Sequence, residues 1–212
     1  MTKKRILKLE ALSTAEQVGE PKPRSEMRDI VLTEAKHQFR KSGFSAVSIN
    51  DIVQAVGITK PTLYYYFKDK ENLYSEVMID MMRHGNEFVE EGIRHVPTTK
   101  EKLEVLTEGF MEHSPTCMMA MMRDAMEHLS ELHIKKVKDA YKYYMVSTFE
   151  SLFQEGITRG EVVEKDPKEL AIIFVGLLDS YTINQTALSG RKFNFKEKAK
   201  ELVNVLMNGI AT

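Results

Sequence analysis

The sequence has a single cysteine, Cys117, and no long apolar run. One cysteine cannot form an internal disulfide, which suits a chain that works in a reducing cytoplasm. No apolar segment approaches the roughly 18 residues that a membrane-spanning helix needs. Near the N-terminus, Lys8 and Glu10 interrupt the apolar stretch that a secretory signal peptide would require. We therefore expect a soluble, cytoplasmic protein with no membrane partner.

The motifs that mark the common classes of enzyme are also missing. The chain has no phosphate-cradling glycine loop, no nucleophile elbow and no HExxH zinc motif. Its histidines include no His-x3-His pair, the spacing that would put two rings on one face of a helix. His128 and His133, the nearest pair, are five residues apart. We accordingly expect no catalytic site, no metal site and no resident cofactor.

What the chain does have is helical periodicity. Of its 212 residues, 42% are apolar and 29% are charged, as in ordinary globular proteins. Segments with the two-residue period of a β-strand are too short to predict a sheet, so the expected fold class is all-α. The expected helices cover residues 25–42, a short pair within 48–67, 70 to about 96, 99–113, a segment from 115, about 131–155, 167–188 and 195–208, with a turn over 156–167.

The formal net charge of −1 conceals an uneven distribution. Residues 1–70 carry 13 Lys and Arg against 8 Asp and Glu, whereas the remainder carries 17 against 23. A basic N-terminal third on an acidic body suits a polyanionic partner at one end of the molecule only.

Residues 48–67, SINDIVQAVGITKPTLYYYF, have the pattern of a helix-turn-helix. Ser48 can cap the first helix, with Asp51 three residues later as its capping-box partner. Gly57 suits the tight exit from that helix, and Thr59 can cap the second one.

The second of these helices would turn three consecutive tyrosines outward. Leu63 and Phe67 are four residues apart and share the inward face, which leaves Lys60, Thr62 and residues 64–66 largely outside. Exposed tyrosines suit a DNA face, since each phenol can hydrogen-bond a phosphate oxygen while its ring packs against sugar. The alternative is an ordinary helix pair whose tyrosines belong to the edge of the core.

The longer pattern resembles the N-terminal domain of the tetracycline-repressor (TetR) family. It is carried by Val31-x3-Ala35-x3-Phe39-x3-Gly43-Phe44, Ser48-x2-Asp51-Ile52, the run from Gly57 to Tyr64, and Phe67-x2-Lys70-x2-Leu73, and it needs no gap. The resemblance implies an N-terminal three-helix helix-turn-helix domain and a C-terminal helical domain for ligand binding and dimerisation. It also implies that Lys70 binds a phosphate.

We expect the DNA-binding residues to divide into two groups. Lys60 and Thr62 are candidates for base edges, with Tyr65 as a second contributor, and the others would mainly bind phosphates. The full set is Ser48, Thr59, Lys60, Thr62, Tyr64, Tyr65, Tyr66 and Lys70.

The expected domains are a flexible basic extension over residues 1–23, the DNA-binding domain over 24–70, and the ligand-binding and dimerisation domain over 71–212. The extension can be an arm that adds phosphate or minor-groove contacts, or simply a frayed terminus.

Methionines cluster around Cys117, at positions 111, 118, 119, 121, 122 and 126. Flexible thioethers re-pack easily, which suits a pocket for an apolar or aromatic small molecule, and the resemblance puts the effector pocket in this region. Plain core packing and a soft-metal site at Cys117 are the alternatives. The candidate ligand-binding residues are Phe88, Phe110, Met118, Met122, Met126, Tyr144 and Phe174.

The helix expected over residues 167–188 is apolar on more than one face, so both sides must be covered. A second subunit would cover it by forming an intermolecular four-helix bundle with the last helix, and the resemblance implies the same dimer. The candidate interface residues are Leu170, Ile173, Leu177, Tyr181, Leu202 and Leu206.

The sequence thus favours a ligand-responsive transcriptional repressor that binds a palindromic operator in double-stranded DNA as a homodimer. A small apolar or aromatic effector would release it. The alternative is a helical small-molecule-binding or protein-interaction module whose helix-turn-helix is only structural.

Overall fold

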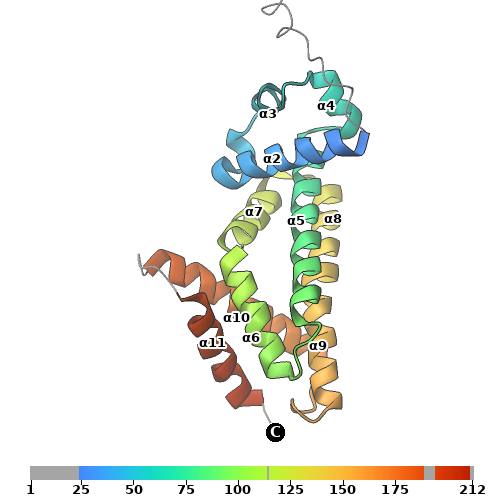
Figure 1. The fold of residues 1–212 in the computed structure, drawn as a ribbon. Helices are drawn as coiled ribbons and strands as arrows, with labels where there is room; N and C mark the ends of the chain where they lie inside the picture. Colours follow the sequence, from blue (N-terminus) through green and yellow to red (C-terminus); the bar gives the residue numbers. More distant parts are fainter. Residues whose placement is uncertain (1–23, 114, 189–193, 211–212) are drawn as a thin grey trace, which may run out of the picture.

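The structure is a computed structural model that describes residues 24–113, 115–188 and 194–210. Three helices form a small head, and the others form an elongated body beneath it (Figure 1). The described residues contain no strand, so the prediction of an all-α chain is confirmed. The predicted extension over residues 1–23 lies outside the described part of the chain.

The helices begin and end close to where their local sequence predicts. In the head, Gly43 has a φ of 77° and a ψ of 175°, so the first helix breaks at the expected glycine before a further short turn. The head consists of α2 (Arg24–Ala46), α3 (Ile49–Val56) and α4 (Lys60–Tyr66). The body consists of α5 (Lys70–Ile93), α6 (Thr99–His113), α7 (Pro115–His128), α8 (Glu131–Tyr141), the π-helical η1 (Lys142–Val146), α9 (Ser147–Thr158), α10 (Pro167–Leu188) and α11 (Phe195–Ile210).

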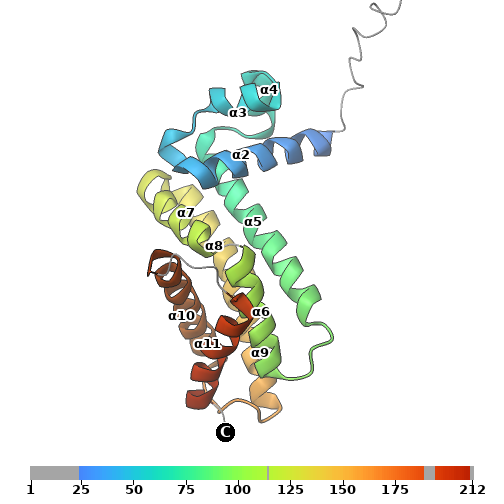
Figure 2. The ribbon, with the colours of Figure 1, turned by 60° about the vertical axis from the view of Figure 1, so that its left-hand side comes forward.

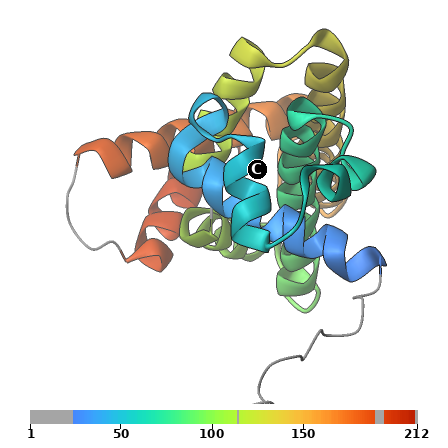
Figure 3. The same ribbon diagram turned by 90° about the horizontal axis from the view of Figure 1, so that it is seen from above.

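Helix α5 runs from the head down the length of the body (Figures 1 and 2). Its first half buries Tyr74 and Met78 in a core cluster shared with the head. Its second half packs Val89 and Ile93 against a separate cluster formed by α6, α9, α10 and α11. One rigid helix therefore belongs to both cores, and α2 lies across its upper end when the head is viewed from above (Figure 3). Within the described residues, every helix is too short or too polar to cross a bilayer.

The helix expected to run without interruption over residues 131–155 contains a π-helical turn, η1. The π-turn inserts extra residues into the helical repeat, which rotates the side chains that follow relative to those before it. Two residues of this turn, Tyr144 and Met145, line a cavity described below. Helical periodicity alone does not reveal such a turn, because its residues are ordinary helix formers.

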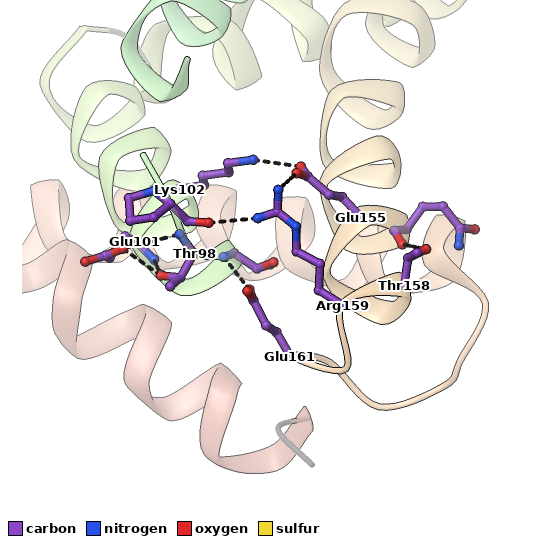
Figure 4. Close-up of polar contacts among 10 residues, drawn as sticks. Thr98, Glu101, Lys102, Glu155, Thr158, Arg159 and Glu161 are labelled. Carbon is purple, nitrogen blue, oxygen red and sulfur yellow. Dashed lines mark hydrogen bonds and ion pairs between the residues drawn. The ribbon is translucent and has the colours of Figure 1, made fainter. Parts of the chain in front are cut away.

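Polar contacts tie the lower end of the body together (Figure 4). Lys102 Nζ donates to Glu155 at 2.7 Å, and Arg159 donates to the carbonyl of Pro97 at 2.8 Å. Glu161 accepts from the backbone N–H of Thr99 at 2.6 Å, and hydrogen bonds from the Thr99 side chain and backbone hold the pKa of its carboxyl below the usual range.

Gly156 does not start a turn, contrary to the expectation for residues 156–167. Helix α9 continues to Thr158, and Gly160, with a φ of 72°, follows its end. Gly156 is instead a point of close packing: a Cβ there would lie 2.7 Å from Thr99 Oγ1 and 2.8 Å from Val162 Cγ2. The glycine is needed for contact between helices rather than for a backbone conformation.

A partly buried polar pair lies between α8 and α10. Tyr141 donates its hydroxyl to Asp179 Oδ2 at 3.2 Å, and Asp179 is 8% exposed. Burial raises the pKa of Asp179 to about 6, and the bond from Tyr141 offsets part of the rise. Burial and the neighbouring carboxylate also raise the pKa of Tyr141.

We predict that this pair makes the chain less stable as the pH rises through the range between 3.8, the ordinary Asp value, and about 6. In that range the folded state holds a proton on Asp179 that the unfolded state has released, so raising the pH favours unfolding. Asp179→Asn stays neutral and keeps an acceptor for Tyr141. It should therefore gain on the order of 2 kcal/mol over the wild type at neutral pH and nothing near pH 3.

Urea unfolding of both proteins at one concentration, from pH 3 to pH 8, measures this difference. Other carboxyls shift both curves alike, so the difference between the curves reports Asp179. Parallel curves would mean that Asp179 ionises in the folded protein as it does in water.

Candidate nucleic-acid interface and effector cavity

Reciprocal caps fix the geometry of the helix-turn-helix. Ser48 Oγ accepts from the backbone N–H of Asp51 at 3.2 Å, and Asp51 Oδ2 accepts from the backbone N–H of Ser48 at 2.9 Å. Hydrogen bonds to the Asp51 carboxylate from the Ser48 hydroxyl and the Ser48 backbone N–H lower the pKa of Asp51. Gly57 ends α3 with a φ of 75°, a left-handed conformation that favours glycine. The expected Thr59 cap on α4 is also present, accepting from the backbone N–H of Thr62.

Helix α4 keeps its apolar side inward and its tyrosines toward the surface. Leu63 is fully buried, and so is Phe67 directly after the helix. Tyr64 is 45% exposed and Tyr65 is 61% exposed. Tyr66 is half-buried and meets the Tyr65 ring edge-on, with the ring centroids 5.1 Å apart.

The polar residues around α4 are also near the surface. Lys60 and Thr59 are exposed, and Thr62 is half-buried with its hydroxyl 2.9 Å from that of Thr59. The Ser48 hydroxyl is exposed but donates to Asp51 Oδ2 at 2.7 Å. Apart from Lys70, the predicted DNA-binding residues therefore lie on or next to the caps and the outer side of α4.

Lys70 does not lie on the outer side of α4 with the other predicted DNA-binding residues. Its ammonium sits 4.2 Å from the centroid of the Phe44 ring, a cation–π contact at the junction between head and body. Partial burial lowers the pKa of Lys70, and attraction to Asp124 offsets part of that effect. A phosphate bound by Lys70 would have to compete with this contact.

Asp124 of α7 is the polar centre of the same junction. Its Oδ2 accepts a hydrogen bond from the backbone N–H of Phe44 and another from the Tyr74 hydroxyl at 3.2 Å. Its Oδ1 lies 3.2 Å from His128 Nδ1, and His128 Nε2 is 2.8 Å from Ser45 Oγ. The head is thus bonded directly to α7.

A cavity of about 360 Å³ lies below this junction, within the size range of small-molecule sites. Two of its lining residues come from α2 in the head, and the others come from α5, α6, α7, η1 and α9. It is lined by Lys36, Arg40, Met81, Met82, His84, Gly85, Asn86, Val89, Leu106, Gly109, Phe110, Met118, Tyr144, Met145, Thr148 and Phe149.

The predicted ligand-binding residues are only partly gathered at this cavity. Phe110, Met118 and Tyr144 line it. Met122 packs against the upper core instead, and Met126 is 53% exposed on the surface of α7. The prediction for these two is wrong for this cavity because α7 is amphipathic and puts only part of its methionines inward.

Phe174 is fully buried with its ring centroid 4.9 Å from that of Phe149, so it backs the cavity wall without lining the cavity. The side chain of Phe88, in α5, lies outside the described part of the chain, as does that of Cys117. Among the side chains that the structure does describe, His, Cys, Asp and Glu form no group of three able to hold a metal ion.

The predicted dimer residues fall on two sides of α10 and α11. Ile173 is 48% exposed and Leu177 is 45% exposed, on the same open side as Ile172. Leu170, in contrast, is buried within the protomer, which corrects its assignment to the interface. Three others, Tyr181, Leu202 and Leu206, are half-buried against the lower core. Sequence analysis did not single out Val205, which is 75% exposed on α11.

Comparison with known proteins finds a family match that covers most of the head and the start of α5. Residues 31–77 match the family model described as bacterial regulatory proteins, tetR family. The fatty acid metabolism regulator protein of Bacillus subtilis is 25% identical over 184 residues, covering 85% of this chain and 93% of that protein. The transcriptional regulator QacR of Staphylococcus aureus is 24% identical over 191 residues, covering 87% of this chain and 98% of that protein.

The fold also matches a solved structure. The transcriptional regulator FadR from Bacillus subtilis, crystallised with stearoyl-CoA, superposes with a TM-score of 0.75. The two sequences are 20% identical, and the match covers 86% of this chain and 98% of that one. At this identity the similarity shows a shared fold, with a helix-turn-helix head on a helical body.

Proposed function

We propose that this chain, which belongs to the tetR family of bacterial regulatory proteins, is a repressor that binds an inverted-repeat operator as a homodimer and is released by a small effector. Its curated relatives are regulators of transcription, and the chain is a transcriptional regulator rather than an enzyme. The observation that carries the proposal is the position of α4. This helix displays Tyr64 and Tyr65 on the head, at the opposite end of α2 and α5 from the cavity.

DNA recognition divides between α4 and its caps. Lys60 is exposed in the first turn of α4, where a recognition helix meets base edges, and Thr62 lies beside it. Tyr64, Tyr65 and Tyr66, together with Ser48 and Thr59, bind phosphates and fix the register of the head on the duplex. Lys70 joins them by exchanging its contact with Phe44 for a phosphate.

The open side of α10 forms the dimer contact. A soluble protein rarely leaves a contiguous apolar patch uncovered, and Ile172, Ile173 and Leu177 are all exposed there. A Cβ built on Gly176, on the same side, meets nothing within 4 Å in the protomer, which leaves room for a second helix. Pairing α10 and α11 across a twofold axis presents two α4 helices to successive major grooves.

An effector in the cavity would act by preferring one arrangement of the heads. A ligand shifts a conformational equilibrium only by its difference in affinity for the two states. The cavity meets this requirement because its lining includes residues of α2 in the head as well as residues of the body. A change in the position of α2 therefore changes the contacts that the ligand makes.

Two variants of α4 distinguish base recognition from phosphate binding. We expect Lys60→Ala to relax the preference at one base pair of each half-site by about 1–3 kcal/mol, because a base-edge contact is lost. Tyr65→Phe loses a hydrogen bond to phosphate, so it should weaken binding to every sequence by roughly three- to tenfold while preserving the preference. Fluorescence anisotropy on DNA from upstream of the gene, with single-base variants and random DNA, measures both.

Lys136→Ala is the matched control, since Lys136 is an exposed cation on α8 in the body. It should bind DNA as the wild type does. Equal losses on specific and random DNA for Lys60→Ala would remove it from base recognition. Binding of the wild type that is weak and the same on every DNA would favour the helical binding module in place of a repressor.

The dimer contact is tested by charge insertion. Ile173→Glu puts a carboxylate into the apolar contact, where desolvation without a partner is costly, and should raise the dimer dissociation constant at least a hundredfold. Leu132→Glu, on the 63% exposed Leu132 of α8, is the control and should leave the dimer intact. Sedimentation over a range of concentrations distinguishes the two. An unchanged dimer in Ile173→Glu would mean that the subunits meet elsewhere.

A further inference from the structure

The cavity has a basic rim that comes from the DNA-binding head. Lys36 and Arg40 are four residues apart on α2 and therefore share one face of that helix. Both line the cavity, Lys36 half-buried and Arg40 exposed. The residues that line the rest of the cavity belong to the body. The rim and the floor of the cavity thus lie on the two parts of the molecule whose relative position decides DNA binding.

These two cations have no partner of their own. In residues 24–113, 115–188 and 194–210, no hydrogen bond, ion pair or cation–π contact engages the side chain of Lys36 or Arg40. Among the side chains that the structure describes, the cavity lining contains no carboxylate. His84, the third basic group of the lining, is already 3.2 Å from the Asp80 carboxylate.

Arg40 lies at the border of the cavity and of a second hollow. The second hollow is shallow and is also lined by Asp124 and Glu127. Asp124 already accepts from Phe44 and Tyr74 and pairs with His128, so it is engaged at the junction. Two positive charges therefore face a cavity whose described lining has no negative charge to neutralise them, and such an arrangement attracts an anion.

The floor of the cavity is apolar and adaptable. Four methionines from three parts of the chain line it, and flexible thioethers fit ligands of varied shape. Two polar side chains of the floor bond each other, with Thr148 Oγ1 donating to Asn86 Oδ1 at 2.5 Å. The methionines are Met81, Met82, Met118 and Met145.

From this combination we infer that the effector is an anionic amphiphile, an acyl chain bearing a carboxylate or phosphate head. Its chain lies among the methionines, and its anionic head binds Lys36 and Arg40. The regulatory consequence of binding such an effector rests on the proposed function. The anionic group of the ligand binds α2 of the DNA-binding head, while the alkyl chain of the ligand is held by helices of the body. The ligand therefore favours the arrangement in which α2 lies over the cavity. An uncharged ligand of the same shape fills the floor of the cavity without forming an ion pair with Lys36 or Arg40 of α2.

The test compares decanoate with decanol, which differ in charge and share an alkyl chain, and includes decanoyl-CoA. A medium chain suits a cavity of about 360 Å³, near the lower end of the range for ligand sites. Calorimetry without DNA compares the wild type, Lys36→Ala/Arg40→Ala and Lys41→Ala, a control on the same helix that does not line the cavity. We expect the wild type to bind decanoate at least tenfold more tightly than decanol. The double variant should lose that preference while keeping its affinity for decanol, and Lys41→Ala should behave as the wild type.

The probes also separate the sources of the anionic head. Preference for decanoyl-CoA over decanoate, lost in the double variant, supports the inference with a phosphate-bearing head. Equal affinity of the wild type for decanoate and decanol overturns it. So does a preference that survives in the double variant, or failure of all three compounds to bind. Because binding is measured without DNA, these results stand apart from the operator experiment, whose failure would overturn the proposed function alone.

Discussion

The carboxylate of Asp124 is the contact on which the arrangement of head and body depends. It accepts from the backbone of Phe44 at the end of α2 and from Tyr74 of α5, and it pairs with His128, which reaches Ser45. A Cβ at Gly43 would lie 3.2 Å from the same carboxylate. The glycine at the break in helix α2 is therefore what lets α7 approach so closely. Since α7 also contributes Met118 to the cavity, one helix touches both the cavity and the head.

A second contact of the same kind supports the first. Glu71, in the first turn of α5, accepts from the backbone N–H of Ser130 at 2.8 Å and lies 3.2 Å from His133 Nδ1, and the Ser130 bond lowers the pKa of Glu71. The start of α8 is thereby held to the start of α5. These polar contacts are few and directional, whereas the apolar core around Tyr74 is continuous from head to body. The junction therefore combines directional polar bonds with a shared apolar core.

The head could be predicted from the sequence because its signals are local. Ser48, Gly57 and Thr59 each fix a helix end through bonds to residues a few positions away, and the structure has all three caps. The cavity could not be predicted in the same way, because its wall is assembled from helices distant in sequence. Nothing near Lys36 or Arg40 indicates that α2 will lie over α5. The methionine cluster around Cys117 contributes only Met118 to the cavity, whereas Met126 faces solvent and Met81 of α5 lines the cavity.

The central claim is that a ligand in the cavity acts on the DNA-binding head through Lys36 and Arg40, the two cations that α2 contributes to the cavity rim. The most direct measurement is the affinity of Lys36→Ala/Arg40→Ala for operator DNA with increasing decanoate, beside calorimetry of decanoate binding to the same variant. The account predicts that the variant binds operator, and that decanoate at concentrations that saturate the variant no longer weakens operator binding as it does in the wild type. Release of the saturated variant from DNA to the same extent as the wild type would contradict the account, because the coupling would then bypass α2.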